Sequence, residues 1–274
     1  MTPRLSISQI TTVGATFAED VAAYAAAGVE GIGIWEMKLG DDDGRDLALV
    51  RDAGLTITHC VPAVPSILPL PLMEGPVDAN ERIEAICASV HRFAAFDPAC
   101  VLFLTGPGGP HATVVEGIRR IAEAGREAGV RVALEPVQRE YAEYWTIVSD
   151  VGPALELLAE ADADDMGVLV DTWHLWNSPA LLDDLRAEVA RIAGVHVADW
   201  RDPTRNTSDR AFPGEGVADL PAILRTLDDA GYRGWYDVEI FSDAEEDSLW
   251  ALPADEAARR ARRSFDRVWT AATS

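Results

Sequence analysis

Four residues that can bind a metal ion each follow or end a short apolar run. They are Glu135 in VRVALEP, Asp171 in MGVLVDTWH, His196 in GVHVAD and Glu239 in GWYDVEI. Carboxylate oxygens and an imidazole nitrogen suit a hard or borderline divalent cation. Active sites of β/α barrels lie where the strands end, so side chains at these positions of a barrel would converge. The spacing therefore predicts one divalent metal site with these four ligands.

Apolar β-type runs alternate with alanine- and leucine-rich stretches of helical spacing along the whole chain. The first two pairs are RLSISQIT with TFAEDVAAYAAAG and GIGIWEMKL with GRDLALVRDAG, and eight pairs are present in all. This alternation is typical of βαβ units around a parallel sheet. It predicts an α/β fold, a single (β/α)8 TIM barrel, with residues 1–274 as one domain. A doubly wound open sheet is the alternative, but the first turn, QITTVGATFAED, lacks the glycine-rich phosphate-binding pattern of such sheets.

The composition of the chain limits its partners and its location. A formal net charge of -23 repels nucleic-acid phosphates and anionic lipid surfaces. The longest apolar stretches are strand-sized, and the first residues, MTPRLSISQ, do not resemble a secretory signal. The three cysteines lack zinc-motif spacing and are odd in number, so a disulfide framework is not expected. We expect a cytoplasmic protein that binds neither nucleic acid nor membrane.

Further residues near the strand ends are candidates for contact with a substrate. His59 ends the third apolar run, TITHCVP, and is expected to face the barrel mouth. Trp173 and His174 belong to the motif DTWH, where the indole face suits the apolar side of a sugar or cyclitol, with packing in the core as the alternative. Glu36 and Lys38 follow the second run, where local ion pairs are the first expectation and substrate contact the second.

A proline-rich segment, PAVPSILPLPLMEGP, follows the third apolar run. It is too long for an ordinary connection between a strand and a helix. Loops of this length often cover a functional site. We therefore expect this segment to pack over the barrel mouth.

The segments LEP, DTWH, HVAD and VEI, in this order on the last four runs, resemble the xylose-isomerase-like sugar isomerase/epimerase superfamily, which includes ketose 3-epimerases and inosose dehydratases. The resemblance covers nearly the whole chain. It includes RAFPGEG, where Arg210 stands three residues before the proline of a P-G-x-G turn, as in the ketose 3-epimerases.

This resemblance implies one bound divalent cation, manganese first, with magnesium or cobalt as alternatives. Its ligands would be Glu135, Asp171, His196 and Glu239. His174 and Arg210 would contact substrate oxygens. The resemblance also implies assembly into a homo-oligomer.

Such a site suits proton transfer next to a carbonyl group. A divalent cation polarises the carbonyl and eases removal of the neighbouring proton. Glu135 and Glu239 are the candidate acid and base, and Arg210 would stabilise the developing negative oxygen. The expected enzyme is a metal-dependent isomerase or epimerase that forms an enediolate on a ketose or related polyhydroxy carbonyl compound. A lyase that dehydrates a keto-cyclitol or a dehydroshikimate-like substrate begins with the same step and stays open.

Two other functions are less consistent with the sequence. A nuclease of this fold would need more histidines for several zinc ions and a surface for phosphates, whereas the chain has five histidines and a strong negative charge. A non-catalytic binding protein on a degenerate barrel would have lost ligands, and all four are present. We expect an enzyme that acts on a small sugar or cyclitol.

Overall fold

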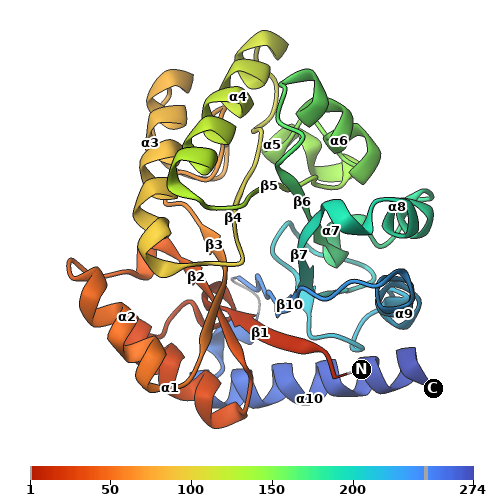
Figure 1. Cartoon of the computed structure of the whole chain (residues 1–274). Helices are drawn as coiled ribbons and strands as arrows, with labels where there is room; N and C mark the ends of the chain where they lie inside the picture. The colour runs from red at the N-terminus through yellow and green to blue at the C-terminus, as the bar shows by residue number, and fades with distance from the viewer. Residues whose placement is uncertain (1, 244–245) are drawn as a thin grey trace.

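The computed structural model describes residues 2–243 and 246–274. Eight parallel strands close into a barrel in the order β1-β10-β7-β6-β5-β4-β3-β2 (Figure 1). Their bounds are Arg4–Ser8 (β1), Gly31–Trp35 (β2), Thr56–Val61 (β3), Cys100–Phe103 (β4), Val132–Leu134 (β5), Gly167–Asp171 (β6), Ile192–Val197 (β7) and Trp235–Val238 (β10). β10 pairs with β1, with Val238 opposite Ile7, and this pairing closes the sheet. The predicted TIM barrel is confirmed.

Helices surround the barrel on the outside (Figure 1). The longer ones are α1 (Phe17–Ala27), α2 (Asp43–Asp52), α3 (Ala79–Phe93), α4 (His111–Ala128), α6 (Val151–Glu160), α8 (Leu181–Ala187), α9 (Leu220–Ala230) and α10 (Ala254–Thr273). In α10 the buried residues Ala257, Ala261, Phe265, Val268 and Ala272 recur every three or four positions, which is the spacing of one helix face. α10 packs against both α1 and α9, so the last helix completes the ring beside the first.

The apolar core has a large outer part and a smaller inner part. The outer part lies between the strands and the helices, and it contains residues such as Tyr24, Phe93 and Phe265. The inner part includes Leu102 and Leu169. Strands such as β6 and β7 are buried along their whole length, because helices cover one side and the barrel interior fills the other.

Polar residues near the second strand pair with residues far away in sequence. Lys38 Nζ lies 2.5 Å from Asp20 Oδ2, and Glu36 Oε1 lies 3.2 Å from Arg92 Nη1. Glu36 and Lys38 thus form ion pairs, but the expectation of a local pair is wrong, because the partners lie on the first and third helices. The cysteines Cys60, Cys87 and Cys100 are free thiols.

Within residues 2–243 and 246–274, no helix combines the length and the apolar content needed to cross a bilayer.

Candidate metal centre and cavity

The four predicted ligands meet at the carboxyl ends of four barrel strands. Glu135 directly follows β5, Asp171 ends β6, His196 is the penultimate residue of β7 and Glu239 directly follows β10. All four side chains are buried, and one ligand atom from each lies within 4.8 Å of the others. The register explains part of this arrangement, because Asp171 pairs with His196 across β6 and β7. The convergence inferred from strand ends is present in the structure.

The chemistry of these donors fits a divalent cation. His196 Nδ1 lies 3.1 Å from Glu239 Oε2 as an ion pair, yet neither ring nitrogen has a hydrogen-bond partner among the described residues. Three buried carboxylates are costly unless cations neutralise them. Oxygen donors with one imidazole are typical ligands of manganese, magnesium, cobalt or zinc. Glu135, Asp171, His196 and Glu239 are therefore able to hold one such ion.

Arg210 reaches the cluster from a small antiparallel hairpin. The hairpin consists of β8 (Asp199–Trp200) and β9 (Arg210–Ala211), with Trp200 opposite Arg210. Asp199 supports the following turn, because its carboxylate accepts hydrogen bonds from the backbone N–H groups of Gly214 and Ala218, both at 2.9 Å. The turn PGEG is thereby held close to the hairpin that carries Arg210.

The guanidinium of Arg210 lies among the acidic ligands. Its Nη1 donates to Asp171 Oδ2 at 2.7 Å and to Glu239 Oε2 at 3.1 Å. Its central carbon lies 4.7 Å from the ring centre of Phe241 and 5.1 Å from that of Trp173. Arg210 is thus a buried counter-charge for two of the three carboxylates.

The two glutamates experience different electrostatic environments. Burial raises the pKa of Glu135, and the nearby negative charges of Asp171 and Glu239 add to that effect. Burial acts in the same direction on Glu239, but the charge and hydrogen bond of His196, together with the charge of Arg210, outweigh it and keep the pKa of Glu239 below its usual value. Glu135 therefore favours its protonated form, whereas Glu239 favours its ionised form.

His174 lies at the edge of the cluster and lines the adjoining cavity. Its Nε2 is 3.5 Å from Arg210 Nη2 and 3.9 Å from Asp171 Oδ2. Burial lowers the pKa of His174 to about 4, against the opposing charge of Asp171. A neutral imidazole is expected here at neutral pH, able to donate or accept one hydrogen bond.

Trp173 occupies a different place from the one expected for a substrate contact. Its side chain is fully buried, and it is stacked on Tyr141 with ring centres 5.6 Å apart. It also contacts His174 edge to face, at 5.0 Å. Trp173 is not among the lining residues of the cavity. Its position behind His174 and Arg210 suits support of these two side chains rather than contact with a ligand.

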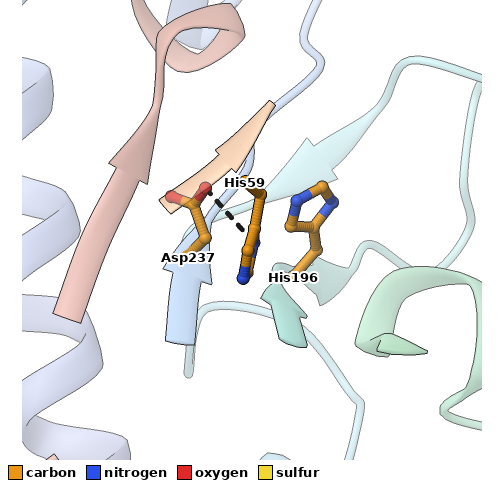
Figure 2. Close-up of side chains that lie close together, drawn as sticks. All are labelled: His59, His196 and Asp237. Carbon is orange, nitrogen blue, oxygen red and sulfur yellow. Dashed lines mark ion pairs between the residues drawn. The ribbon is translucent and has the colours of Figure 1, made fainter. Parts of the chain in front are cut away.

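His59 lies one layer deeper than the four ligands. Figure 2 shows it between Asp237 and His196. His59 Nδ1 is 3.6 Å from Asp237 Oδ2, and the ring centres of His59 and His196 are 5.1 Å apart. Asp237 precedes Glu239 by two residues and shares its strand face. The three side chains form a second group with metal-binding atoms within 4.8 Å of one another.

The expectation that His59 faces the mouth is therefore not supported. His59 stands two residues before the end of β3, so its side chain points into the barrel interior below the ligand layer. It is not among the residues that line the cavity. Two glycines leave space for this layer, because an added Cβ would lie 2.2 Å from His59 Nε2 at Gly194 and 2.1 Å from Asp237 Oδ2 at Gly33.

The substitution Gly194→Ala tests this packing. Because the new Cβ would overlap the His59 ring, we expect a loss of roughly 1–3 kcal/mol in the free energy of unfolding. Denaturant titration measures it. The same substitution in a His59→Ala background should cost little, whereas an equal loss in both backgrounds would contradict the contact. Gly14→Ala is the control, because nothing lies within 4 Å of its added Cβ.

A cavity of about 390 Å³ opens beside two of the candidate metal ligands, Glu135 and Glu239. Its polar lining near the ligands consists of Glu135, His174, Arg210 and Glu239. The proline-rich segment after β3 contributes Pro65, Leu72 and Met73, so the expectation that it covers the mouth is confirmed.

Arg82 holds this segment in place. Its guanidinium donates to the backbone oxygen of Ser66 at 2.8 Å and to the Ser66 hydroxyl at 2.7 Å. Trp145, from α5 (Ala142–Trp145), and Trp250, from the short 3-10 helix Leu249–Ala251, also line the cavity. Neither was anticipated from the sequence, because helices of three or four residues are too short to show a regular apolar pattern.

The sequence matches a family model described as "Xylose isomerase-like TIM barrel" over residues 21–268. The chain belongs to this family. The match covers seven of the eight barrel strands, since only β1 lies outside it. It includes the four converging candidate ligands. The resemblance inferred from the strand-end motifs is confirmed.

Relatives of this xylose isomerase-like protein carry several enzyme names. An inosose dehydratase of Erwinia tasmaniensis is 33% identical over 54% of this chain and 52% of its own length. An inosose isomerase of Halalkalibacterium halodurans is 28% identical over 54% of this chain and 51% of its own length. A 3-dehydroshikimate dehydratase of Pseudomonas aeruginosa is 27% identical over 87% of this chain and 38% of its own length. The chain spans about half the length, or less, of these curated relatives.

Solved structures share the whole barrel. Protein SMc04130 from Sinorhizobium meliloti 1021 has a TM-score of 0.85 and 30% identity, over 97% of this chain and 98% of that chain. The IOLI protein "with a binding zinc atom" has a TM-score of 0.78 and 20% identity, over 97% of both chains. L-ribulose 3-epimerase has a TM-score of 0.78 and 18% identity, over 99% of this chain and 96% of that chain. At their low identities, the last two structures show the common fold alone.

Proposed function

We propose that this protein is a metal-dependent isomerase or epimerase that forms an enediolate on an α-hydroxy carbonyl substrate. The observation that carries the proposal is the meeting of two buried glutamates, Glu135 and Glu239, with Asp171 and His196 in one cluster at a cavity. The glutamates come from β5 and β10, which are separated in the sheet by β6 and β7. They therefore approach the cavity from different directions.

The two glutamates would have different roles in the proton transfer. A divalent cation in this cluster would polarise the carbonyl group and make the neighbouring C–H more acidic. Glu239, favoured in its ionised form by His196, is suited to accept the proton. Glu135, which comes from β5 and approaches the cavity from a different direction, is suited to return one. Return to the opposite face gives an epimer, and return to the adjacent carbon gives an isomer.

Arg210 and His174 would hold the substrate oxygens. Arg210 Nη1 is engaged by Asp171 and Glu239, whereas Nη2 faces His174 at 3.5 Å. A guanidinium in this position would stabilise negative charge as it develops on an oxygen. The neutral His174 imidazole would add a hydrogen bond.

A dehydratase is the second candidate, favoured by the names of the inosose and 3-dehydroshikimate dehydratases among the relatives. Removal of the same proton followed by expulsion of a β-hydroxyl would give this reaction. We also propose that the metal is manganese and that the chain is a single functional domain. The proposal further includes assembly into a homo-oligomer and a cytoplasmic location. Zinc is an alternative metal, because the IOLI structure holds it.

Deuterium incorporation tests the proposal. Protein stripped with a chelator is reloaded with manganese, magnesium, cobalt or zinc and incubated with ketoses and keto-cyclitols in heavy water. We expect metal-dependent deuterium at the carbon next to the carbonyl, together with an epimer or isomer of unchanged formula. Loss of water with an ultraviolet-absorbing enone would instead identify the dehydratase. Absence of exchange with every metal and substrate would contradict both functions for sugars and cyclitols.

A further inference from the structure

The cavity has two polar groups in its lining and is otherwise apolar. Glu135, His174, Arg210 and Glu239 all belong to the ligand end. Thr207, Ser208 and Asp243 form a second polar group, from the segment around the β8-β9 hairpin and the chain after β10. The other lining residues are aliphatic or aromatic. Hydrogen-bonding groups for a carbonyl and its adjacent hydroxyl are therefore present at the cluster, and outside the two polar groups the lining is apolar.

One wall of the cavity is aromatic. The ring of Phe241 lies 5.6 Å from that of Trp35 and 5.9 Å from that of Trp250, measured between centres. The indole N–H of Trp35 donates to Ser8 Oγ at 3.0 Å, and that of Trp250 donates to the Ile240 carbonyl at 2.8 Å. Because the protein itself uses these donors, both indoles offer a ligand only their carbon surfaces.

Another part of the lining is aliphatic. Leu104 and Val137 form a buried cluster against which Met73 and Trp145 pack, and all four line the cavity. None of these side chains carries a hydrogen-bonding group except the indole of Trp145. Hydroxyl groups placed against this surface would lose their water without gaining partners, which is costly.

The mouth continues this apolar character. Of the five large hydrophobic side chains that are exposed among the described residues, two line the cavity: Met37, which is 63% exposed, and Leu72, which is 52% exposed. Exposed apolar side chains gathered at a cavity entrance are typical of a binding site. They would cover the outer part of a bound apolar group.

We infer that the substrate is a hydroxy ketone with a carbon-rich body, aryl or alicyclic, rather than an open polyhydroxy chain. This inference rests on the proposed function for the hydroxy ketone head, which would bind at Glu135 and Glu239. The body would lie between the aromatic wall of Trp35, Phe241 and Trp250 and the aliphatic surface of Leu104 and Val137.

Two probes with the same head test the inference. Phenacyl alcohol and dihydroxyacetone both present a hydroxymethyl ketone, but the rest of the first is a phenyl ring and the rest of the second is another hydroxymethyl group. Calorimetric titration into the manganese-loaded full chain measures their binding. We expect the Kd of phenacyl alcohol to be at least about tenfold lower, which corresponds to about 1.4 kcal/mol. Equal or tighter binding of dihydroxyacetone would overturn the inference.

Variants in the apolar lining test whether this surface causes the preference for phenacyl alcohol over dihydroxyacetone. Trp145→Gln and the exposed Met37→Gln should each weaken phenacyl alcohol binding and leave dihydroxyacetone binding nearly unchanged. The Met37 variant secures the test if Trp145→Gln fails to fold, because its side chain is 63% exposed. Val77→Gln is the control, since Val77 is 86% exposed and lies outside the cavity. An unchanged preference in both cavity variants would contradict the proposed binding mode.

A parallel exchange measurement separates this inference from the proposed function. Both probes carry exchangeable protons on the hydroxymethyl carbon, so deuterium incorporation above the protein-free rate reports the chemistry. Tighter binding of phenacyl alcohol without exchange of either probe would support the apolar substrate and contradict the isomerase chemistry. Exchange of both probes without any binding preference would support the chemistry and overturn the apolar substrate.

Discussion

The variants Glu135→Gln and Glu239→Gln are expected to lose catalysed proton exchange by a factor of roughly 10²–10⁴, the range typical of a missing general acid or base. Each substitution keeps the size of the side chain but removes a charged oxygen from the ligand cluster. Bound metal should fall as well, because a neutral amide oxygen is a weaker ligand than a carboxylate. Exchange of the substrate proton in heavy water and metal content per chain by mass spectrometry measure the two losses.

The two glutamate variants should also differ from each other. Glu239 lies 3.1 Å from both His196 Nδ1 and Arg210 Nη1, so its replacement removes the negative charge beside the His196 ligand and one carboxylate partner of Arg210. We therefore expect the larger loss of metal in Glu239→Gln. Glu143→Gln is the control, because Glu143 is exposed and lies on α5 close to the cavity residue Trp145. Full activity and full metal content in both cluster variants would refute the proposed centre.

Arg210→Met is expected to destabilise the protein strongly when a chelator is present. The substitution leaves Asp171 and Glu239 buried without the guanidinium that contacts both. Removing one partner of a buried ion pair costs about 3–5 kcal/mol in the free energy of unfolding. Saturating manganese should recover much of that loss, since a cation bound only by the folded state stabilises it and also supplies positive charge. Denaturant titrations with chelator and with manganese measure the difference.

Arg260 offers a matched control for Arg210. It also combines an ion pair, with Glu215, and a contact over an aromatic ring, that of Phe212 at 5.0 Å. Its side chain is 37% exposed, so Arg260→Met should cost less than about 1 kcal/mol relative to the unsubstituted protein, and this cost should be the same with chelator and with manganese. If manganese changed the stability of the two arginine variants equally, Arg210 would not be the counter-charge of the metal ligands.

The barrel itself was predictable because each of its elements has a local signature. Apolar runs such as GIGIW and MGVLVD are rich in the β-branched residues isoleucine and valine. This composition distinguishes them from the alanine-rich helical stretches between them. The β8-β9 hairpin was not predicted, because its strands have two residues each and no alternating pattern. This hairpin carries Arg210 into the site, so the motif located the residue while the structure revealed how it is held.

The depth of side chains within the barrel was less predictable. His59 and His196 both lie in strands and are followed by a small apolar residue. His59 nevertheless lies below the layer of candidate ligands, whereas His196 lies within it. Their heights depend on the stagger between β3 and β7, which do not neighbour each other in the sheet. Gly194 and Gly33 mark the deeper layer, but their role becomes visible only when the side chains opposite them are placed.

The sequence alone determined the donor set of the site: Glu135, Asp171, His196 and Glu239 on the last four strands. It did so because residue type fixes which atoms can bind a cation, and because parallel strands in a barrel end on a common face. Only the tertiary structure decided what surrounds these donors. Trp35 ends β2, whereas Trp145 and Trp250 reach the cavity from short helices far away in sequence, so no local pattern predicted the complete apolar lining that would select the substrate.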